Sequence, residues 1–313
     1  MALGVEGVRV GTWTAPSGVS GCTVVLPPEG TLGAVAVRGS APGTREAAAL
    51  GIHGKLTVCH AVVLSGGSAF GLATADGVMR WLEAQGIGYP VGEAVVPIVG
   101  AAIVLDGAIF DPDSRPGSAA GEAACLAANV EDPGEGPVGV GAGCTVAKVS
   151  GLDRGRPSGQ GIAVRRAGGV TVGAIVANNA VGEVMAEDGT WIARSDAPED
   201  EPRYPFGGQH FAGQGSGGPT SNTVIGVIVT DAKLDKREAH RVADLGHSGT
   251  ARAIRPAHTE ADGDALFCLA TGRVEASVDL VAALAADAVA EAARRGPLVA
   301  AEARRAREGG GRP

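Results

Sequence analysis

The eight residues at 223–230, T-V-I-G-V-I-V-T, are the most constraining feature of the sequence. β-branched residues at this density favour a strand that is buried in the protein interior. The preceding segment, from Arg194 to Asn222, has neither a helix nor a strand period; it begins with charged residues and ends in a Gly/Ser/Gln tract. A loop of this length is rare inside a compact chain and is usually a functional loop or a linker. The sequence therefore predicts a core strand whose first residue, Thr223, directly follows a long loop.

The rest of the chain alternates apolar runs with glycine and proline, which is typical of a mixed α/β fold. We expect strands at 8–12, 22–26, 32–38, 56–64, 94–105, 138–149, 170–176 and 265–270. We expect helices at 72–86, 121–129, 235–245 and 278–295. A Gly/His/Arg loop should follow the third helix, and a short Arg-rich helix should follow the fourth after Gly296 and Pro297. Asp235 and Glu238 have the spacing of a capping box at the start of the third helix.

The composition indicates a globular chain packed from small side chains. Hydrophobic residues make up 45% of the 313 residues and charged residues 19%, which is enough for a buried core. Glycine occurs 51 times, about twice its usual share, whereas aromatic residues make up only 3%. We therefore expect close backbone approaches and many turns.

The charge pattern restricts the classes of partner that the protein can bind, and the cysteines indicate the redox state of its compartment. A net charge of −8, without basic residues interleaved with aromatic ones, argues against nucleic-acid binding. The apolar run 94–105 contains Pro97 and Gly100 and is shorter than the ~18–20 residues of a membrane span, so we expect no membrane insertion. The first residues lack the pattern of a secretory signal. The five scattered cysteines include no C-x-x-C pair, so we expect reduced thiols in a cytoplasmic protein.

The patterns of common cofactor and metal sites are missing from the sequence. Gly139, Gly141 and Gly143 do not have the dinucleotide-binding spacing, and the six histidines do not have metal-ligand spacing. The run G-G-S-A-F-G contains Ser68 and resembles a nucleophile elbow, but Phe70 stands where G-x-S-x-G needs glycine. We therefore expect no metal and no cofactor.

Thr223 has the position that the precursor of an N-terminal-nucleophile hydrolase needs, first in a buried strand and preceded by a Gly-rich segment. Its hydroxyl could attack the preceding carbonyl and move the acyl group from nitrogen to oxygen, after which water releases it. The new α-amino group, with a pKa near ~8, could then act as general base for the same hydroxyl. The alternative is an ordinary β-branched residue at the start of a strand.

Four further positions carry polar side chains that could take part in this chemistry. Lys148, one of four lysines, lies in C-T-V-A-K-V, where burial would lower its pKa. Asn179 follows Asn178 at an interruption of the strand A-I-V-A-N-N-A-V-G and offers an amide to an oxyanion. Asp262 and Asp264 offer paired carboxylates. The alternatives are a lysine with its head in solvent, an asparagine turn, and a turn with two exposed carboxylates.

Five segments together carry a resemblance that no single one of them would carry. They are C-H-A-V-V-L-S-G-G-S-A-F-G-L at 59–72, G-A-G-C-T-V-A-K at 141–148, N-A-V-G at 179–182, N-T-V-I-G-V-I-V-T-D-A at 222–232 and R-A-I-R-P-A-H-T-E-A-D-G-D-A-L-F at 252–267. In this order they resemble the DmpA-like family of self-processing N-terminal-nucleophile hydrolases. That family includes the L-aminopeptidase/D-esterase, β-aminopeptidases and the endo-type nylon-oligomer hydrolase. The resemblance covers nearly the whole chain.

The resemblance implies a fold, a cut and an assembly. The fold is an αββα sandwich of the type shared with ornithine acetyltransferase, formed by residues 1–313 as one domain. The cut divides this domain into an α chain, 1–222, and a β chain, 223–313. The cleaved αβ units are expected to assemble into tetramers or larger homo-oligomers.

The resemblance also implies a role for each candidate residue. Thr223 matches the nucleophile and Asn222 matches the residue before the cut. Lys148 matches the lysine that helps to activate the hydroxyl in the nylon-hydrolase branch, and Asn179 matches the asparagine that stabilises the oxyanion. The pair formed by residues 262 and 264 matches the positions that orient the nucleophile and its amino group.

With threonine as its nucleophile, the chain resembles the nylon-hydrolase branch of the family. The aminopeptidase branch uses serine at this position. Ser68 and Phe70 match the substrate-binding loop, in which the nylon hydrolase has a tyrosine where this chain has Phe70. The resulting hypothesis is an amide hydrolase that acts through Thr223 on small amides or short peptides, with ω-amino-acid oligomers among them. Two alternatives stay open: an acyltransferase of the ornithine-acetyltransferase type, and a small-molecule-binding protein whose junction never cleaves.

Overall fold

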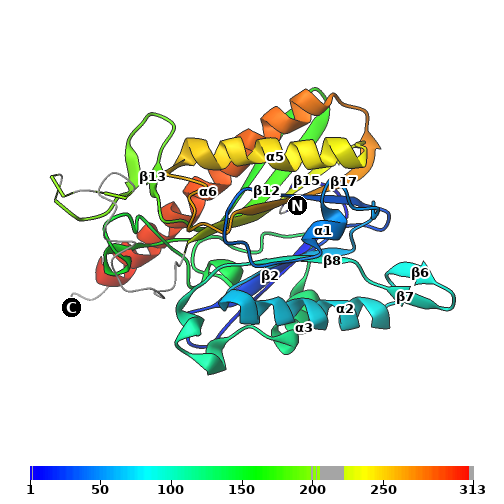
Figure 1. Cartoon of the computed structure of the whole chain (residues 1–313), viewed down its shortest axis with the longest axis horizontal. Coiled ribbons are helices and arrows are strands. Elements are labelled where there is room, and N and C mark those ends of the chain that lie inside the picture. The colour runs from blue at the N-terminus through cyan, green and yellow to red at the C-terminus, as the bar shows by residue number, and fades with distance from the viewer. Residues whose placement is uncertain (2, 199, 202, 205–221, 310–313) are drawn as a thin grey trace.

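The computed structural model describes residues 1, 3–198, 200–201, 203–204 and 222–309. Two five-stranded sheets lie face to face, and helices cover the outer face of each sheet (Figure 1). The chain thus has the αββα sandwich that the sequence predicts. The Gly-rich end of the expected long loop, 205–221, lies outside the described residues.

The first sheet has the strand order β1-β2-β5-β8-β4. Its strands are β1 (Arg9–Thr14), β2 (Gly21–Leu26), β5 (Ala61–Ser65), β8 (Val99–Ile103) and β4 (Thr44–Arg45). β5 and β8 are parallel, and the other neighbours are antiparallel. Helices α2 (Thr74–Ala84) and α3 (Ser118–Ala127) cover its outer face, at the bottom of Figure 1.

The second sheet has the strand order β11-β12-β15-β17-β3. Its strands are β11 (Gly159–Ala167), β12 (Val170–Asn179), β15 (Thr223–Ala232), β17 (Ala265–Val274) and β3 (Leu32–Val37). β15 and β17 are parallel, and the other neighbours are antiparallel. Helices α5 (Lys236–Ala253) and α6 (Val278–Gly309) cover its outer face, at the top of Figure 1. The run at 223–230 therefore forms the central strand of a buried sheet.

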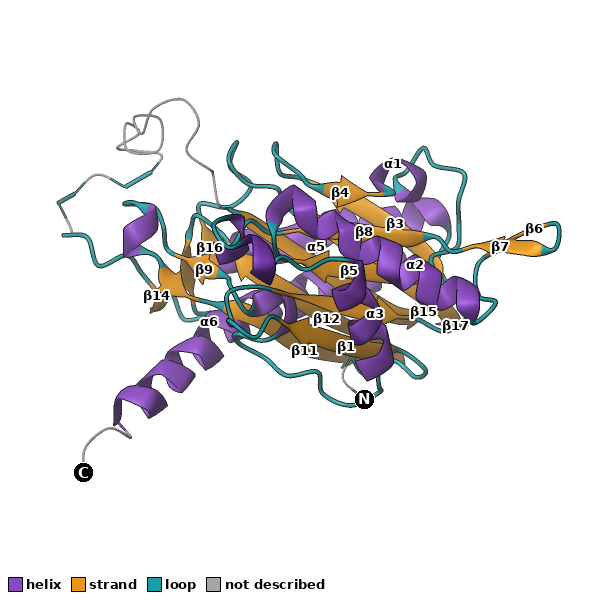
Figure 2. Cartoon of the chain, turned by 90° about the horizontal axis from the view of Figure 1, so that it is seen from below, coloured by secondary structure: helices purple, strands orange, loops and turns teal. Residues whose placement is uncertain are grey.

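Short elements complete the chain. Helix α1 (Ala47–Leu50) follows β4, and the 3-10 helix η1 (Ser68–Ala73) lies between β5 and α2. The remaining strands are β6 (Tyr89–Val91), β7 (Ala94–Val96), β9 (Thr145–Val146), β10 (Arg156–Pro157), β13 (Glu183–Met185), β14 (Trp191–Ala193) and β16 (Ile254–Arg255). The β6–β7 hairpin projects from the sandwich (Figure 2). No helix in the described ranges is long and apolar enough to cross a membrane.

Buried aliphatic side chains form three layers. One lies between the first sheet and its helices, one between the sheets, and one between the second sheet and its helices. Glycine allows the layers to come close: a Cβ on Gly249 of α5 would lie 2.1 Å from the carbonyl oxygen of Ala286 in α6. Close helix contact of this kind explains how a chain so poor in aromatic residues buries a core.

The alternation of side chains along β15 decides where Thr223 points. Ile225 belongs to the layer between the two sheets, whereas Val224 faces the helices. Because side chains alternate along a strand, Thr223 lies on the same side as Ile225, toward the space between the sheets. Asn179 is the register partner of Thr223 and lies on that side too, because Ala177 of β12 belongs to the layer between the sheets.

Three of the expected strands are wrong in extent. The strand expected at 56–64 is β5, which begins only at Ala61. The run at 94–105 is divided into β7 and β8, because Pro97 has no N–H to continue a ladder. The run at 138–149 contains only the 3-10 turn Gly139–Gly141 and the two-residue β9. Its alternating glycines bring the backbone close to neighbouring segments: a Cβ on Gly141 would lie 2.1 Å from the nitrogen of Gln160.

Two expected helix ends are also wrong. α5 continues to Ala253 through the residues expected to form a Gly/His/Arg loop, because its glycines pack against β15 and α6. α6 continues through Pro297 to Gly309, where a break was expected. A Cβ on Gly296 would lie 2.5 Å from the carbonyl oxygen of Gly159, so helix and sheet stay in contact there. The capping box is confirmed: Asp235 accepts from the Glu238 N–H, and Glu238 accepts from the Asp235 N–H.

Candidate active site

Thr223 lies at the start of the central strand of the second sheet and is 5% exposed. Neighbouring segments hold both residues of the Asn222–Thr223 peptide bond. Asn222 forms a parallel bridge with Asp262, and Thr223 itself pairs with Asn179 of β12. The peptide bond between Asn222 and Thr223 is therefore fixed within the fold.

The carbonyl oxygen of Asn222 receives two hydrogen-bond donors. One is the Thr223 hydroxyl, which contacts this oxygen directly. The other is the backbone N–H of Gly263, at 3.2 Å. A Cβ on Gly263 would lie 2.6 Å from the Ala41 carbonyl oxygen and 3.1 Å from Thr223 Oγ1. Glycine at 263 therefore leaves room for the hydroxyl and brings an N–H to the carbonyl.

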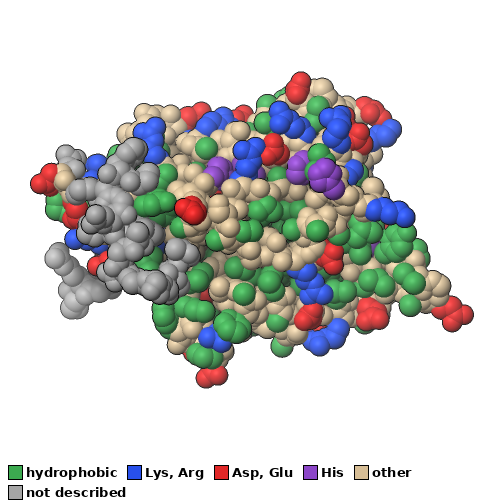
Figure 3. All heavy atoms as spheres, in the orientation of Figure 1, with side chains coloured by type: hydrophobic (Ala, Val, Ile, Leu, Met, Phe, Trp, Pro, Cys, Tyr) green, Lys and Arg blue, Asp and Glu red, His purple; other side chains and the backbone are tan. Residues whose placement is uncertain are grey.

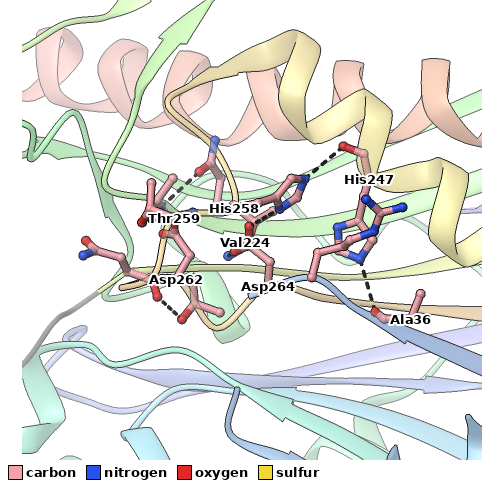
Figure 4. A network of polar contacts seen from close by, with 12 residues as sticks. Ala36, Val224, His247, His258, Thr259, Asp262 and Asp264 are labelled. Carbon is pink, nitrogen blue, oxygen red and sulfur yellow. Dashed lines mark hydrogen bonds and ion pairs between the residues drawn. The ribbon is translucent and has the colours of Figure 1, made fainter. Parts of the chain in front are cut away.

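Asp262 is a buried carboxyl with one oxygen in use. Its Oδ2 accepts hydrogen bonds from the N–H and the hydroxyl of Thr259, at 2.7 and 2.6 Å (Figure 4). Its Oδ1 is buried and has no hydrogen-bond partner among the residues that the structure describes. Burial and the charge of Asp264 raise the pKa of Asp262 to about 6.

Asp264 connects β15 to a histidine. Its Oδ1 accepts from the Val224 N–H at 2.6 Å, and its Oδ2 contacts Nδ1 of His258 at 2.6 Å (Figure 4). Nε2 of His258 lies 3.2 Å from the carbonyl oxygen of His247. Because a carboxylate and a carbonyl oxygen only accept, both ring nitrogens of His258 carry hydrogen, and the ring is an imidazolium.

The two histidines of this network differ in charge. Burial works against a charged His258, but the hydrogen bond and charge of Asp264 outweigh it and raise the pKa of His258. Burial lowers the pKa of His247 to about 4, so this ring is neutral at pH 7. The rings stand edge to face at 4.9 Å, and Nε2 of His247 lies 3.2 Å from the Ala36 carbonyl oxygen.

Lys148 is among the largest fully buried side chains, at 1% exposure. Its Nζ donates to the backbone oxygen of Asn179 at 3.0 Å and to the Asn179 Oδ1 at 3.3 Å. Burial lowers the pKa of Lys148 to about 7, although the charge of Asp262 favours the protonated form. The alternative of a lysine head in solvent is wrong, because the loop 144–148 runs beside 179–182 and covers it.

Hydrogen bonds from neighbouring segments hold the Asn179 side chain in one orientation. Its Oδ1 accepts from the Thr145 N–H at 2.9 Å and from Lys148, while its Nδ2 donates to the Leu105 carbonyl oxygen at 2.9 Å. The asparagine pair does not interrupt the strand as expected, because β12 runs through both residues. Asn178 faces the opposite way and donates to the Ala293 carbonyl oxygen of α6.

The predicted site residues thus fall into two groups. Six of them form one cluster: Lys148, Asn179, Asn222, Thr223, Asp262 and Asp264. Ser68 and Phe70 lie at the start of η1, and neither has a hydrogen bond or ring contact with Thr223 within the described part of the chain. Phe70 is 56% exposed, and the Arg115 guanidinium lies 4.0 Å from its ring centroid.

The run S-G-G-S at 65–68, within the segment 59–72, supports the cluster from the first sheet. The Asp106 carboxylate accepts from the Ser20 hydroxyl at 2.7 Å and from the Gly67 N–H at 3.0 Å. A Cβ on Gly66 would lie 1.9 Å from this carboxylate, so the first glycine is required by close approach. Asp106 follows Leu105, whose carbonyl holds Asn179. The motif therefore anchors the segment that orients the asparagine.

Sequence reasoning missed His258, His247 and Gly263. The histidines lack metal-ligand spacing, so this pattern does not mark them as site residues. His258 lies four residues before Asp262 in the segment 252–267, and its place in that segment was the available signal. His247 carried no local signal, because it lies within α5. No group of three or more potential ligand side chains among the described residues could hold a metal ion.

Comparison with protein families and curated proteins places the chain among peptidases. The family described as Peptidase family S58 matches residues 3–310. An uncharacterized aminopeptidase of Mycobacterium tuberculosis is 41% identical over 289 residues, which cover 86% of this chain and 81% of the relative. A 6-aminohexanoate-oligomer endohydrolase of Agromyces sp. is 32% identical over 273 residues, which cover 86% of this chain and 74% of the relative.

Solved structures with the same fold confirm the predicted architecture. A β-aminopeptidase of Burkholderia sp. has a TM-score of 0.68 at 22% identity, covering 99% of this chain and 94% of that chain. The L-aminopeptidase D-Ala-esterase/amidase of Ochrobactrum anthropi, described as a variant of the Ntn hydrolase fold, has a TM-score of 0.68 at 20% identity. That match covers 93% of this chain and 83% of the other.

Proposed function

The chain belongs to peptidase family S58 and is an amide-bond hydrolase, and we propose that it acts through Thr223 after cutting its own backbone behind Asn222. The observation that carries this proposal is the arrangement around one carbonyl oxygen. The Thr223 hydroxyl and the Gly263 N–H both contact the oxygen of the peptide bond that would be cut. The hydroxyl that would attack and an N–H that would stabilise the oxyanion thus contact the same peptide group.

Self-cleavage would proceed as a shift of the acyl group from nitrogen to oxygen. Thr223 Oγ1 bonds to the carbonyl carbon of Asn222 and loses its proton, while the Gly263 N–H stabilises the negative charge on the oxygen. The C–N bond then breaks, and the nitrogen takes up a proton and becomes the α-amino group of Thr223. Water hydrolyses the resulting ester, which leaves a carboxylate on Asn222 and restores the hydroxyl.

Lys148 is the group best suited to take the hydroxyl proton during self-cleavage, because the uncut chain has no α-amino group at Thr223. With its pKa lowered to about 7, a large fraction of this lysine is neutral near pH 7. Its Nζ is bound to the backbone oxygen of Asn179, the register partner of Thr223. The lysine therefore stands beside the strand end where the cut would occur.

Asp262 is the natural partner of the amine that the cut creates. A buried carboxylate oxygen without a donor costs free energy, and its Oδ1 is such an oxygen among the described residues. Asp262 also bridges Asn222, so its carboxyl belongs to the segment beside the cut. An α-ammonium or α-amine group on Thr223 would supply the missing hydrogen bond.

Hydrolysis of a substrate amide would use the same groups as self-cleavage. The α-amine of Thr223 takes the proton of its own hydroxyl, which attacks the substrate carbonyl. The Asn179 amide, oriented by Leu105, Thr145 and Lys148, stabilises the oxyanion. The acyl group passes to Thr223 Oγ1, the substrate amine leaves with the proton, and water hydrolyses the ester.

The proposed substrates are small amides and short peptides, with ω-amino-acid oligomers among them. The relative from Agromyces that is named for 6-aminohexanoate oligomers supports this class. We assign Ser68 and Phe70 to the wall of the substrate site. Phe70 would offer an apolar face rather than a hydroxyl, so it would contact methylene groups of the substrate.

We further propose that the cleaved protein forms a cytoplasmic homo-oligomer of αβ units, with four units as the simplest case. The β6–β7 hairpin exposes Tyr89, Val91 and Val96, and hydrophobic side chains gather on this side of the molecule (Figure 3). A second copy of the chain could cover such a surface. The five cysteines are buried and free, which suits a reducing compartment.

The purified protein is expected to consist of two chains, 1–222 and 223–313. Their masses should be about 22 and 9 kDa, which is the 30.9 kDa of the whole chain divided in proportion to length. A denaturing gel followed by N-terminal sequencing of the smaller chain tests this. A first residue other than Thr223, or an intact chain after long incubation, would contradict self-cleavage at this bond.

Hydrolysis is expected to increase with pH as the α-amino group loses its proton. A charged Lys148 lowers the pKa of this amine, whereas Asp262 and Asp264 raise it, so we expect the ascending limb between about pH 6 and 8.5. The carboxylates also favour a substrate with a free amino end over its N-acetylated analogue. Measuring kcat/KM from pH 5 to 10 on both amides tests the two statements. A flat profile would exclude the amine as base, whereas equal rates on the two substrates would contradict only the preference.

A further inference from the structure

We infer that His258 is a positioning residue: it fixes the Asp264 carboxylate, and through that carboxylate it holds the end of β15 that carries Thr223. The inference rests on the proposed function, because it concerns the same nucleophile. Nothing in the local sequence assigns this role to His258. The geometry of the loop between α5 and β17 carries it (Figure 4).

His258 is bound at both ends of its ring. Nδ1 donates to Asp264 Oδ2 at 2.6 Å, and Nε2 donates to the His247 carbonyl oxygen at 3.2 Å. The first contact lies in the loop that follows β16, and the second lies in α5, so the ring ties the loop to the helix. The backbone of His258 has a φ of 56°, which is uncommon for a residue other than glycine. The surrounding contacts therefore hold this residue in a conformation that costs free energy.

Asp264 is a buried carboxyl that is paired with the His258 ring. The carboxyl is 1% exposed, and its other side-chain contact is the Val224 N–H. An isolated buried charge costs free energy, and a buried charge that is paired and hydrogen-bonded costs less. A cation at 2.6 Å compensates for that burial. The His258 ring thus fixes one oxygen of Asp264, while the Val224 N–H binds the other.

The hydrogen bond between the Asp264 carboxylate and the Val224 N–H takes the place of a backbone hydrogen bond between β15 and β17. Pairing of β15 with β17 begins only at Ile225, which is opposite Ala265. On this side of the strand, the Val224 N–H is therefore held by a side chain rather than by a neighbouring backbone. After the cut, Thr223 becomes a chain end and loses the covalent bond to Asn222. The Asp264 contact then limits fraying of the strand beside the nucleophile.

The charged groups that face His258 come from three elements. Asp262 and Asp264 lie on its own loop, and His247 lies on α5. Arg38, at the end of β3, acts on His247 and is itself paired with Asp244. Because His247 is neutral, His258 is the histidine cation in this group. Removing that cation leaves the site more negative, which raises the pKa of the nearby α-amine and moves the ascending limb of activity to higher pH.

Two substitutions separate the two contacts of the ring. His258→Asn places an amide N–H near the position of Nδ1 and keeps a neutral donor for Asp264. His258→Gln reaches the position of Nε2 and keeps the donor for the His247 carbonyl instead. We expect His258→Gln to lower kcat of hydrolysis by about 10²-fold with little change in KM, because the nucleophile is misplaced while the substrate site is intact. We expect His258→Asn to recover most of this loss, with its ascending limb at higher pH than in the unsubstituted protein.

His240→Gln is the matched control, because this half-buried histidine of α5 lies 2.9 Å from the Val35 carbonyl oxygen and has no hydrogen bond to the cluster within the described residues. It should leave the rates of self-cleavage and hydrolysis unchanged. A second test is His258→Gln combined with Asp264→Asn, which should be no slower than Asp264→Asn alone if His258 acts through Asp264. Unchanged kcat in His258→Gln, or equal losses in the Asn and Gln variants, would overturn the inference. If the unsubstituted protein neither splits nor hydrolyses amides, the proposed function fails instead.

A third measurement tests the inference even if the His258→Gln variant does not fold. The ring ¹⁵N shifts of His258, identified by their loss in His258→Asn, are expected to show an imidazolium at pH 7 in the unsubstituted protein. A neutral His258 ring at pH 7 would overturn the inference without use of the Gln variant.

Discussion

Replacing Thr223 by valine or alanine is expected to leave the chain uncut and to reduce amide hydrolysis by about 10⁴-fold or more, because no other group supplies the nucleophilic oxygen. Valine keeps the shape and β-branching of threonine in a buried strand, so its effect isolates the hydroxyl. Thr223→Ser should keep some of both activities. A denaturing gel and kcat on a small amide measure the two effects.

Thr230→Val is the matched control for this prediction. Thr230 is buried in the same strand, and its hydroxyl donates to the Thr171 carbonyl oxygen at 2.9 Å, away from the cluster. This variant should lose some stability and keep both activities. Continued turnover by Thr223→Val would rule out the mechanism, and a cut chain in that variant would show that another group attacks the peptide.

Replacing Lys148 by methionine is expected to slow both self-cleavage and hydrolysis by about 10²-fold or more, the scale of a lost acid–base or electrostatic partner. Methionine fills the space of the long buried side chain, whereas Lys148→Ala should show the same loss together with a cavity. The cause is the amine, whose pKa is lowered to about 7 by burial. As the pH increases through this value the neutral fraction rises, so self-cleavage should become faster.

Precursor from cell-free synthesis, transferred to buffers from pH 6 to 8.5, gives the rate at which the fragment 223–313 appears. Lys148→Met should lose the dependence on pH near 7. Lys233→Met is the control, because that lysine is exposed and paired with Glu275 and should leave the rate unchanged. Unaltered rates in Lys148→Met would reduce Lys148 to a structural residue.

Local patterns in the sequence were sufficient for the elements that depend on neighbouring residues alone. The β-branched run that begins at Thr223 forms the central strand of the second sheet, and the capping box of Asp235 starts α5. Both features depend on residues within a few positions of each other, where side-chain preference decides the backbone conformation. The resemblance in five separate segments then predicted the sandwich, which the similar structures confirm.

Contacts between distant segments decided where the regular elements end. α5 continues past the glycines at which a loop was expected, because those glycines bring it against α6. α6 likewise continues through Pro297, because Gly296 packs on the backbone of Gly159. Glycine and proline disfavour a helix locally, and the burial gained from packing outweighs that preference.

The site shows the same division between local and tertiary information. Residue type alone marked Thr223, Lys148 and Asp262 as candidates, but the sequence left an exposed lysine and an exposed acidic turn as alternatives. The fold buries both charges beside the end of β15, which shifts the pKa values of Lys148 and Asp262 toward about 7 and 6. Such shifts depend on solvent exclusion by segments far apart in the chain, so no local pattern predicts them.

By itself, the sequence determined the strand, the position of Thr223 at its start and the family to which the chain belongs. Only the tertiary structure decided which groups surround Thr223. It brought the Gly263 N–H to the Asn222 carbonyl and placed His258 between Asp264 and α5. The physical reason is that hydrogen bonds and charges act over a few ångströms in space, and the fold alone determines which residues come within that distance.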